Sequence, residues 1–183
     1  PQLTIHKHVS KYMRNLTIII LLLTSISWGN KPVMPFELSL TDYNYSLAYS
    51  VTYKLTNEKL TITFSGELEN EKDSILYSTS MLPKNKIKKL SKINIDSLSV
   101  LYSNSCISDG DIKTFKLKKN GITKSVTLQN YYHEELSPVI EIINGIVPKK
   151  YKMYYNKKEL IQEMNDCGKF RIIKNWKEYN KGN

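Results

Sequence analysis

Residues that could do chemistry are sparse in this chain, and their spacing argues against most catalytic mechanisms. Beyond residues 1–27, which are interpreted below as a leader, His133 is the only histidine. A zinc site usually needs three or more ligands at recognisable spacing, and the run His133-Glu134-Glu135 lacks the second histidine of a metalloprotease helix. We therefore expect no metal site and no cofactor. His133 itself is expected to be exposed or to cap the first turn of a helix.

Nucleophilic catalysis meets the same difficulty, because a serine or cysteine would need that single histidine as its base. The chain contains no Gly-x-Ser-x-Gly elbow, and neither Walker nor dinucleotide-binding glycine patterns occur in it. No catalytic residue is therefore predicted, and the chain is expected to act without being an enzyme.

Paired carboxylates are harder to exclude, since the acids of a hydrolase can come from distant parts of a sequence. Asp109 and Asp111 flank Gly110, and Glu134 adjoins Glu135. The Asp-Gly-Asp run resembles part of a calcium loop, but the glutamate at the twelfth position of such a loop is missing. Gly110 is therefore expected in a turn in which the aspartates bond the backbone. A hydrolase that uses a carboxylate pair stays open as the alternative function.

Tyrosine, present 13 times, is the enriched residue type that suits binding. Its flat ring carries a polar tip, which fits interfaces and sugar-binding surfaces. A stripe of alternating tyrosines and an adjacent pair predict a candidate binding surface, although the same stripe would also suit a sheet face packed under a helix. The candidates are Tyr45, Tyr49, Tyr53, Tyr131 and Tyr132.

The N-terminal region has the pattern of a secretory signal peptide. A basic start at Arg14 precedes an apolar stretch over residues 16–26, which at 11 residues is shorter than the roughly 18 of a membrane-spanning helix. Small side chains at Ser25 and Ser27 predict cleavage near Ser27, and no cysteine is near for lipid attachment. Residues 1–12 are either an over-long gene start or an extended basic region. An uncleaved anchor is the alternative; otherwise we expect a periplasmic or secreted protein without a membrane span.

Cys106 and Cys167 are the only cysteines. An even count in an oxidising compartment favours a disulfide between them. The alternatives are two separate buried thiols, or one nucleophilic cysteine served by a histidine.

The net charge of +10 does not point to nucleic acid. Beyond the leader Arg171 is the only arginine, whereas arginine is the side chain best suited to phosphate and guanine contacts. We therefore expect a lysine-covered, solvated surface and no nucleic-acid partner. The densest basic cluster, at residues 84–92, is where an exception would lie.

Hydrophobic periodicity predicts the elements that would position these residues. Alternation of period 2 indicates hairpins over 43–65 and over 112–128, the second around Asn120-Gly121, and shorter strands over 98–102, 151–155 and 170–172. Residues 74–82 are ambiguous. Helical spacing indicates helices over 84–92, 132–147 and 157–165, the last capped by Asn156 and Glu159.

These elements predict an α+β fold: a single antiparallel sheet of about six strands with two or three helices on one face. We expect one globular domain over 28–183, a size that buries about two thirds of the chain's surface, with a short polar tail at 180–183.

Three short segments carry a resemblance to known sequences. Residues 102–111 (YSNSCISDGD), 130–133 (NYYH) and 144–148 (NGIVP) are similar to stretches of small uncharacterised exported proteins of Bacteroidetes. The resemblance spans about residues 95–155 and implies export and an intact domain. It carries over no functional residue.

Together these patterns predict an exported, non-catalytic domain that binds a protein or glycan partner at the cell envelope.

Overall fold

The computed structural model describes residues 35–44, 46–66, 68 and 71–179. The chain divides into two units, Pro1–Pro32 and Val33–Asn183, and the fold below is that of the second. The expected leader at 1–27, the candidate Tyr45 and the expected tail at 180–183 lie outside the described residues.

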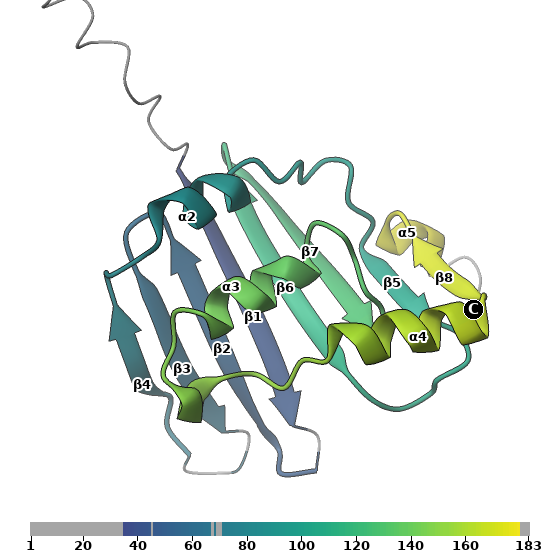
Figure 1. The fold of residues 1–183 in the computed structure, drawn as a ribbon, viewed down its shortest axis with the longest axis horizontal. Helices are drawn as coiled ribbons and strands as arrows, with labels where there is room; N and C mark the ends of the chain where they lie inside the picture. The colour runs from purple at the N-terminus through teal and green to yellow at the C-terminus, as the bar shows by residue number, and fades with distance from the viewer. Residues whose placement is uncertain (1–34, 45, 67, 69–70, 180–183) are drawn as a thin grey trace, which may run out of the picture. The chain divides into compact units, whose positions relative to one another are not determined.

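One sheet of eight strands organises this unit, in the order β4-β3-β2-β1-β6-β7-β5-β8 (Figure 1). The strands are β1 (Phe36–Asn44), β2 (Tyr49–Thr56), β3 (Leu60–Gly66), β4 (Ser74–Thr79), β5 (Leu101–Asn104), β6 (Ile112–Lys119), β7 (Ile122–Gln129) and β8 (Phe170–Ile173). The helices are α2 (Lys84–Leu90), α3 (Ser137–Asn144), α4 (Lys157–Cys167) and α5 (Trp176–Tyr179), with a 3-10 turn η1 (Lys149–Tyr151).

The α+β class is confirmed, but the prediction of about six antiparallel strands is wrong. The sheet is mixed, because β5 pairs parallel with β7 and antiparallel with β8. A parallel pair needs a long connection rather than a hairpin, so no local turn signal marks it. Two further strands were not predicted: β1, although Phe36, Leu38 and Leu40 alternate with polar residues, and β4, an edge strand without a buried face.

The two hairpins with strong local signals form as expected. In β6–β7, Asn120 and Gly121 have φ angles of 51° and 78°. These left-handed values at both central residues match the turn that suits a two-residue hairpin. In β2–β3, the Thr56 N–H donates to Lys59 O at 2.9 Å and closes the turn. Residues 43–44, which were predicted to belong to the hairpin over 43–65, form the end of β1 instead.

Three of the helices agree with the predicted positions but differ in extent. α2 buries Ile87 and Leu90, and α4 starts as predicted, with Asn156 Oδ1 accepting a hydrogen bond from Glu159 N at 3.2 Å. α3 is shorter than the predicted 132–147, so Pro138 falls in its first turn, where a proline is tolerated. The predicted strand over 170–172 forms β8, and α5, which was not predicted, begins at Trp176.

The predicted strand over 151–155 is wrong. Residues 149–151 form η1, and the backbone of Met153 pairs with a side chain instead of a strand. Asn144 Nδ2 donates to Met153 O and Asn144 Oδ1 accepts from Met153 N, both at 2.9 Å. The alternating residues satisfied the strand period, yet the amide of Asn144 takes the place of a neighbouring strand.

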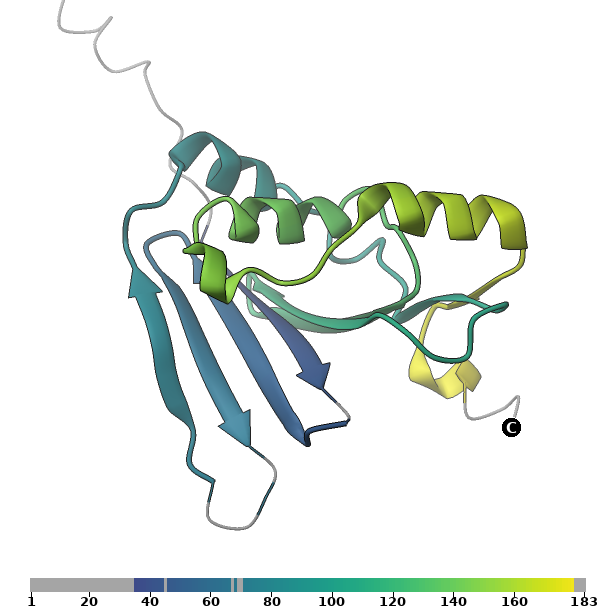
Figure 2. The ribbon, with the colours of Figure 1, turned by 60° about the horizontal axis from the view of Figure 1, so that its bottom comes forward.

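Helices α2, α3 and α4 lie on the same face of the sheet (Figure 2). The apolar sides of α2 and α3 and the inward-facing residues of the central strands form the main core, which continues the alternation seen in the sequence. Fully buried members include Leu38, Leu40, Leu55, Leu60, Ile62, Phe115, Val126, Leu136, Val139 and Ile143. The last residues of β1 lie beside the first residues of β2 and β6, at one end of the sheet.

Candidate functional site

A cleft of about 940 Å³ opens where the ends of β1, β2 and β6 meet. β1 lies between the other two strands and runs antiparallel to both, so its last residues adjoin the first residues of β2 and β6. The strap, defined here as residues 148–156, crosses above them on its way from α3 to α4. We call this the first cleft; its lining includes Asp42, Asn44, Tyr49, Tyr53, Asp109, Lys150, Tyr151 and Tyr154.

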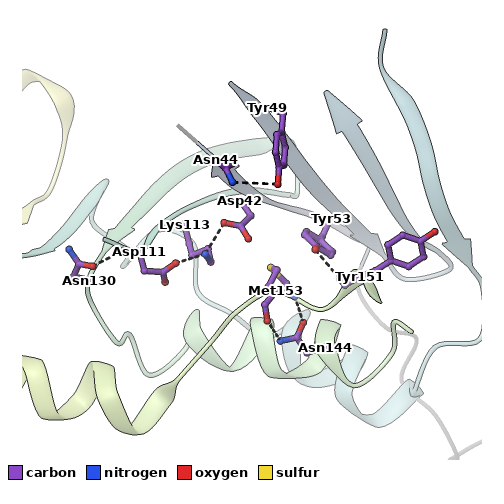
Figure 3. Close-up of polar contacts among 10 residues, drawn as sticks. All are labelled: Asp42, Asn44, Tyr49, Tyr53, Asp111, Lys113, Asn130, Asn144, Tyr151 and Met153. Atoms are coloured by element: carbon purple, nitrogen blue, oxygen red, sulfur yellow. Dashed lines mark hydrogen bonds and ion pairs between the residues drawn. The ribbon is translucent and has the colours of Figure 1, made fainter. Parts of the chain in front are cut away.

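A buried lysine flanked by two carboxylates lies beside this cleft (Figure 3). Lys113 on β6 is in register with Asp42 on β1, and its Nζ donates to Asp42 Oδ1 at 2.8 Å. The same ammonium also donates to Asp111 Oδ1. The Lys113 side chain is 5% exposed, against 31% for Asp42 and 26% for Asp111, and of the three only Asp42 lines the first cleft.

Lys113 keeps its charge in this environment. Burial lowers the pKa of its ammonium, but attraction to Asp111 and Asp42, with the hydrogen bonds to both, outweighs burial and leaves the pKa above its ordinary value. A lysine that stays protonated cannot act as a nucleophile or a general base. Its role here is to hold two carboxylates in place.

Two tyrosines of β2 take different roles in the first cleft. Tyr53 is buried, and its hydroxyl donates to Tyr151 O at 2.9 Å, which ties the strap to the sheet. Burial, followed by the charge of Asp42 and the neighbouring Tyr49, raises the pKa of Tyr53 to about 12. Tyr49 lies nearer the opening, where its hydroxyl accepts from Asn44 Nδ2 at 3.4 Å and its ring lies 5.4 Å from that of Phe64.

The Asp109-Gly110-Asp111 loop forms a turn at the edge of the first cleft, and the side chain of Asn130 holds this turn in place. Asn130 Oδ1 accepts from Asp111 N at 2.7 Å, and Asn130 Nδ2 donates to Asp109 O at 2.9 Å. Gly110 has φ 127°, and a Cβ there would lie 2.4 Å from Asn130 Oδ1, so glycine is required. Over the described residues 35–44, 46–66, 68 and 71–179, no group of three or more His, Cys, Asp or Glu side chains could hold a metal ion.

A second cleft, of about 630 Å³, lies against α4 and contains aromatic rings. The ring of Tyr131 lies 5.4 Å from that of Tyr102 and 5.6 Å from that of Phe170. The ammonium of Lys157 lies 5.0 Å from the ring centre of Tyr132, a cation–π distance. This cleft is lined by Tyr102, Tyr131, Tyr132, His133, Glu134, Glu135, Ile161 and Met164, among others.

His133 has a local structural role in the second cleft. The imidazole Nδ1 of His133 accepts hydrogen bonds from Glu135 N at 3.2 Å and Leu136 N at 3.4 Å. The backbone N–H of His133 donates to Ser137 Oγ at 2.9 Å. Burial lowers the pKa of its imidazole despite the two neighbouring glutamates, which oppose this shift. Such a neutral ring caps the turn that leads into α3, as the sequence suggested.

The disulfide between Cys106 and Cys167 is confirmed, with a Cα–Cα distance of 5.8 Å. It joins the loop after β5 to the last residue of α4, beside the hydrogen bond from Ser105 N to Lys169 O. Both thiols are consumed, so neither cysteine is a nucleophile.

The structure does not bring the candidate tyrosines into one surface. Tyr49 and Tyr53 belong to the first cleft, Tyr131 and Tyr132 to the second, and Tyr45 is outside the described residues. Of the four, Tyr53 is buried and serves the core as well as the strap.

Sequence reasoning missed the charged residues of the first cleft, Asp42 and Lys113. A signal for Lys113 was present, because it shares the inward-facing register of Phe115 and Leu117 on β6. A lysine at an inward position needs a partner. The same signal was present for Asp42, which shares the inward-facing register of Leu38 and Leu40 on β1, a strand that was not predicted.

Comparison with known proteins adds no relative to this description. A scan of the chain found no family model that matches it, and a search of curated proteins found no similar sequence. Within the part of the chain that the structure describes, no helix has both the length and the apolar character needed to cross a membrane.

Proposed function

We propose that this chain is an exported domain without catalytic activity, which binds a macromolecular partner at the cell envelope through the first cleft. Export is supported by the leader pattern at residues 1–27 and by the Cys106–Cys167 disulfide, which suits an oxidising compartment. The observation that carries the binding role is the cleft itself, in which the exposed ring of Tyr154 and the partly buried rings of Tyr49 and Tyr151 lie beside polar side chains.

A glycan chain fits this lining better than a protein surface does. Sugars present apolar C–H faces and polar hydroxyl edges, and a tyrosine ring offers an apolar face with a polar tip. Tyr154 is 73% exposed, while Tyr49 and Tyr151 line the same cleft. Carboxylate, amide and ammonium groups of Asp42, Asn44 and Lys150 supply partners for hydroxyl groups.

The pairing of the charged groups supports binding of a neutral ligand. Asp42, which lines the cleft, is held by Lys113, so its free oxygen is fixed before a ligand arrives and little side-chain entropy is lost on binding. The charged side chains that line the first cleft, Asp42, Asp109, Lys150 and Lys152, sum to zero, so the ligand does not need to carry a compensating charge.

The carboxylate pair also gives the rival function, an envelope hydrolase, one observation in its favour. Two carboxylates that accept from one ammonium lie at most about 6 Å apart, close to the spacing of retaining glycosidases. However, the Lys113 ammonium occupies the space between Asp42 and Asp111 where a scissile bond would have to enter. The geometry therefore favours binding over cleavage.

Binding of soluble oligosaccharides released from envelope glycans, measured by calorimetry with the purified protein, tests this proposal. We expect Tyr154→Ala to weaken binding about tenfold, the scale of a lost aromatic contact. Tyr132→Ala, the same change in the second cleft, is the matched control and should leave the affinity unchanged.

Absence of glycan binding by the unaltered protein would contradict the proposal, as would equal losses in the two variants. Release of reducing ends that disappears in Asp111→Asn would establish the hydrolase instead.

A further inference from the structure

The helix α2 crosses one end of the sheet, opposite to the end that forms the first cleft. The strand register places the end of β4, the start of β1 and the β6–β7 turn at this end. α2 follows β4, and by Ile93 the chain has reached β6, where Lys119 Nζ donates to Ile93 O at 3.3 Å (Figure 1). The length of β1 separates Phe36, at this end, from Asn44 in the first cleft by about 27 Å.

Lysines cover the outer side of α2. The segment 84–92 contains five lysines and no acid, and all five are exposed: Lys84, Lys86, Lys88, Lys89 and Lys92. Lys86 points toward the end of α3, because its Nζ lies 3.8 Å from the position that a Cβ on Gly145 would take. Lys84 and Lys88, four residues apart, share the other side of the helix. They therefore face away from α3, toward the end of the molecule.

The charges of this cluster have no ion-pair partner in the described part of the chain. Among residues 35–44, 46–66, 68 and 71–179, no ion pair involves any of the five lysines, and Glu37, an acid at this end, is paired with Lys54 at 2.9 Å. Like charges four residues apart destabilise a helix, and a lysine in the first turn opposes the helix dipole. The cluster is thus unfavourable in the isolated protein, and an anionic partner would remove this cost.

Exposed apolar side chains lie on both sides of the lysines. Met81, three residues before Lys84, is 86% exposed. Ile122, which is opposite Lys119 in the β6–β7 register, is 48% exposed. Surfaces that lie on anionic bilayers combine lysines, which reach the lipid phosphates, with apolar side chains that enter the acyl boundary. A soluble polyanion would contact the lysines alone and leave the apolar side chains in water, so this combination favours a bilayer.

We propose that this end of the domain docks on the surface of an anionic lipid bilayer. Lys84, Lys88 and Lys92 contact the phosphates, and Met81 and Ile122 enter the interface without spanning the bilayer. The first cleft, at the other end of β1, is then open to ligands away from the bilayer. This inference rests on the export that the proposed function includes, but not on the glycan ligand.

Co-sedimentation of the intact protein with lipid vesicles tests this proposal. We expect stronger binding to vesicles of phosphatidylglycerol and phosphatidylcholine in equal parts than to phosphatidylcholine alone, and weaker binding as the salt concentration is raised. Lys84→Gln/Lys88→Gln removes two charges and should weaken binding about thirtyfold, the usual contribution of two lysines near an anionic surface. Met81→Ser removes one apolar contact with the lipid and should weaken binding about fivefold.

Lys158→Gln/Lys169→Gln, which removes two exposed lysines on α4 and just after it, is the matched control and should leave vesicle binding unchanged. Residues 1–27 are the same in both double variants, so they cannot produce a difference between them. Equal binding to both kinds of vesicle, or equal losses in the two double variants, would overturn the proposal. So would unchanged binding in Met81→Ser together with equally strong binding to dextran sulfate, which would assign the lysines to a soluble polyanion.

Glycan binding by the same variants separates this proposal from that for the first cleft. Tyr154→Ala should bind vesicles as the unaltered protein does, and Lys84→Gln/Lys88→Gln should keep its affinity for glycan. Each proposal can therefore fail while the other holds.

Discussion

Different kinds of contact hold the walls of the two clefts in place. At the first cleft, the strap is held by the Tyr53 hydroxyl and the Asn144 amide, and the floor by the ions around Lys113. At the second, the wall is α4, whose only buried side chain is Leu160. α3, next to the strap, buries five residues.

This difference explains where the disulfide lies. A helix that buries one side chain gains little from the hydrophobic effect, which is worth roughly 1.5–3 kcal/mol for a large apolar side chain. α4 therefore depends on Cys106–Cys167 and on polar contacts such as the one from Asn104 Nδ2 to Glu163 O at 3.3 Å. The first cleft is built on a packed core and needs no covalent link. Charge pairing and covalent linkage thus stabilise two neighbouring regions of the molecule, since Asp111 of the ion cluster follows Cys106 by five residues.

The largest expected effect comes from removing the lysine of the first cleft. Lys113→Met leaves Asp42 and Asp111 close together without their shared cation, and loss of one partner from a buried ion pair costs about 3–5 kcal/mol. Chemical denaturation measures the loss. Lys116→Met, an exposed lysine on the same strand, is the control, with an expected change within about 0.5 kcal/mol. Equal losses in the two variants would show that the ion cluster does not stabilise this end.

A somewhat smaller effect is expected from removing the disulfide of the second region. The double variant Cys106→Ala/Cys167→Ala removes a disulfide that joins residues 61 positions apart. Such disulfides contribute about 2–4 kcal/mol to the free energy of unfolding. Because α4 has little burial of its own, its amides should exchange with solvent before those of β2 and β3. Hydrogen exchange followed by mass spectrometry measures this order. Uniform loss of protection across the sheet and α4 would remove the distinction between the two regions.

The smallest effect concerns His133 at the second cleft. Its pKa in the folded protein lies below the ordinary value of 6.5, so the unfolded chain binds more protons as the pH falls below that value. Stability should therefore decrease from about pH 6.5 down to the folded pKa, while Glu134 and Glu135 limit the decrease. Denaturation midpoints at a series of pH values measure this slope. His133→Gln should flatten it, and an unchanged slope would assign it to other groups.

Much of the fold could be predicted because its signals are local. The β6–β7 hairpin follows from Asn120-Gly121 between alternating residues, and the start of α4 follows from Asn156. The disulfide followed from an even cysteine count in a chain expected to be exported. Each of these depends on neighbouring residues or on composition, which a sequence displays directly.

The candidate site could be predicted only in part, for reasons that lie outside any single segment. Tyr49 was identified by its place in a stripe, but Asp42 acquires its role from Lys113, 71 residues away. The strap satisfied the period of a strand, yet Asn144 took the hydrogen bonds that a strand would have made. Edge strands such as β4 lack a buried face, so alternation cannot identify them.

By itself, the sequence determined the β2–β3 and β6–β7 hairpins, the positions of α2, α3 and α4, and the pairing of the two cysteines, because turn residues, caps and apolar periodicity act over a few positions. Only the tertiary structure decided that β5 inserts between β7 and β8, that Lys113 lies between two aspartates, and that the tyrosines divide between two clefts. These outcomes depend on which strands become neighbours. That choice is made by burial and by long-range pairing, which no stretch of sequence records alone.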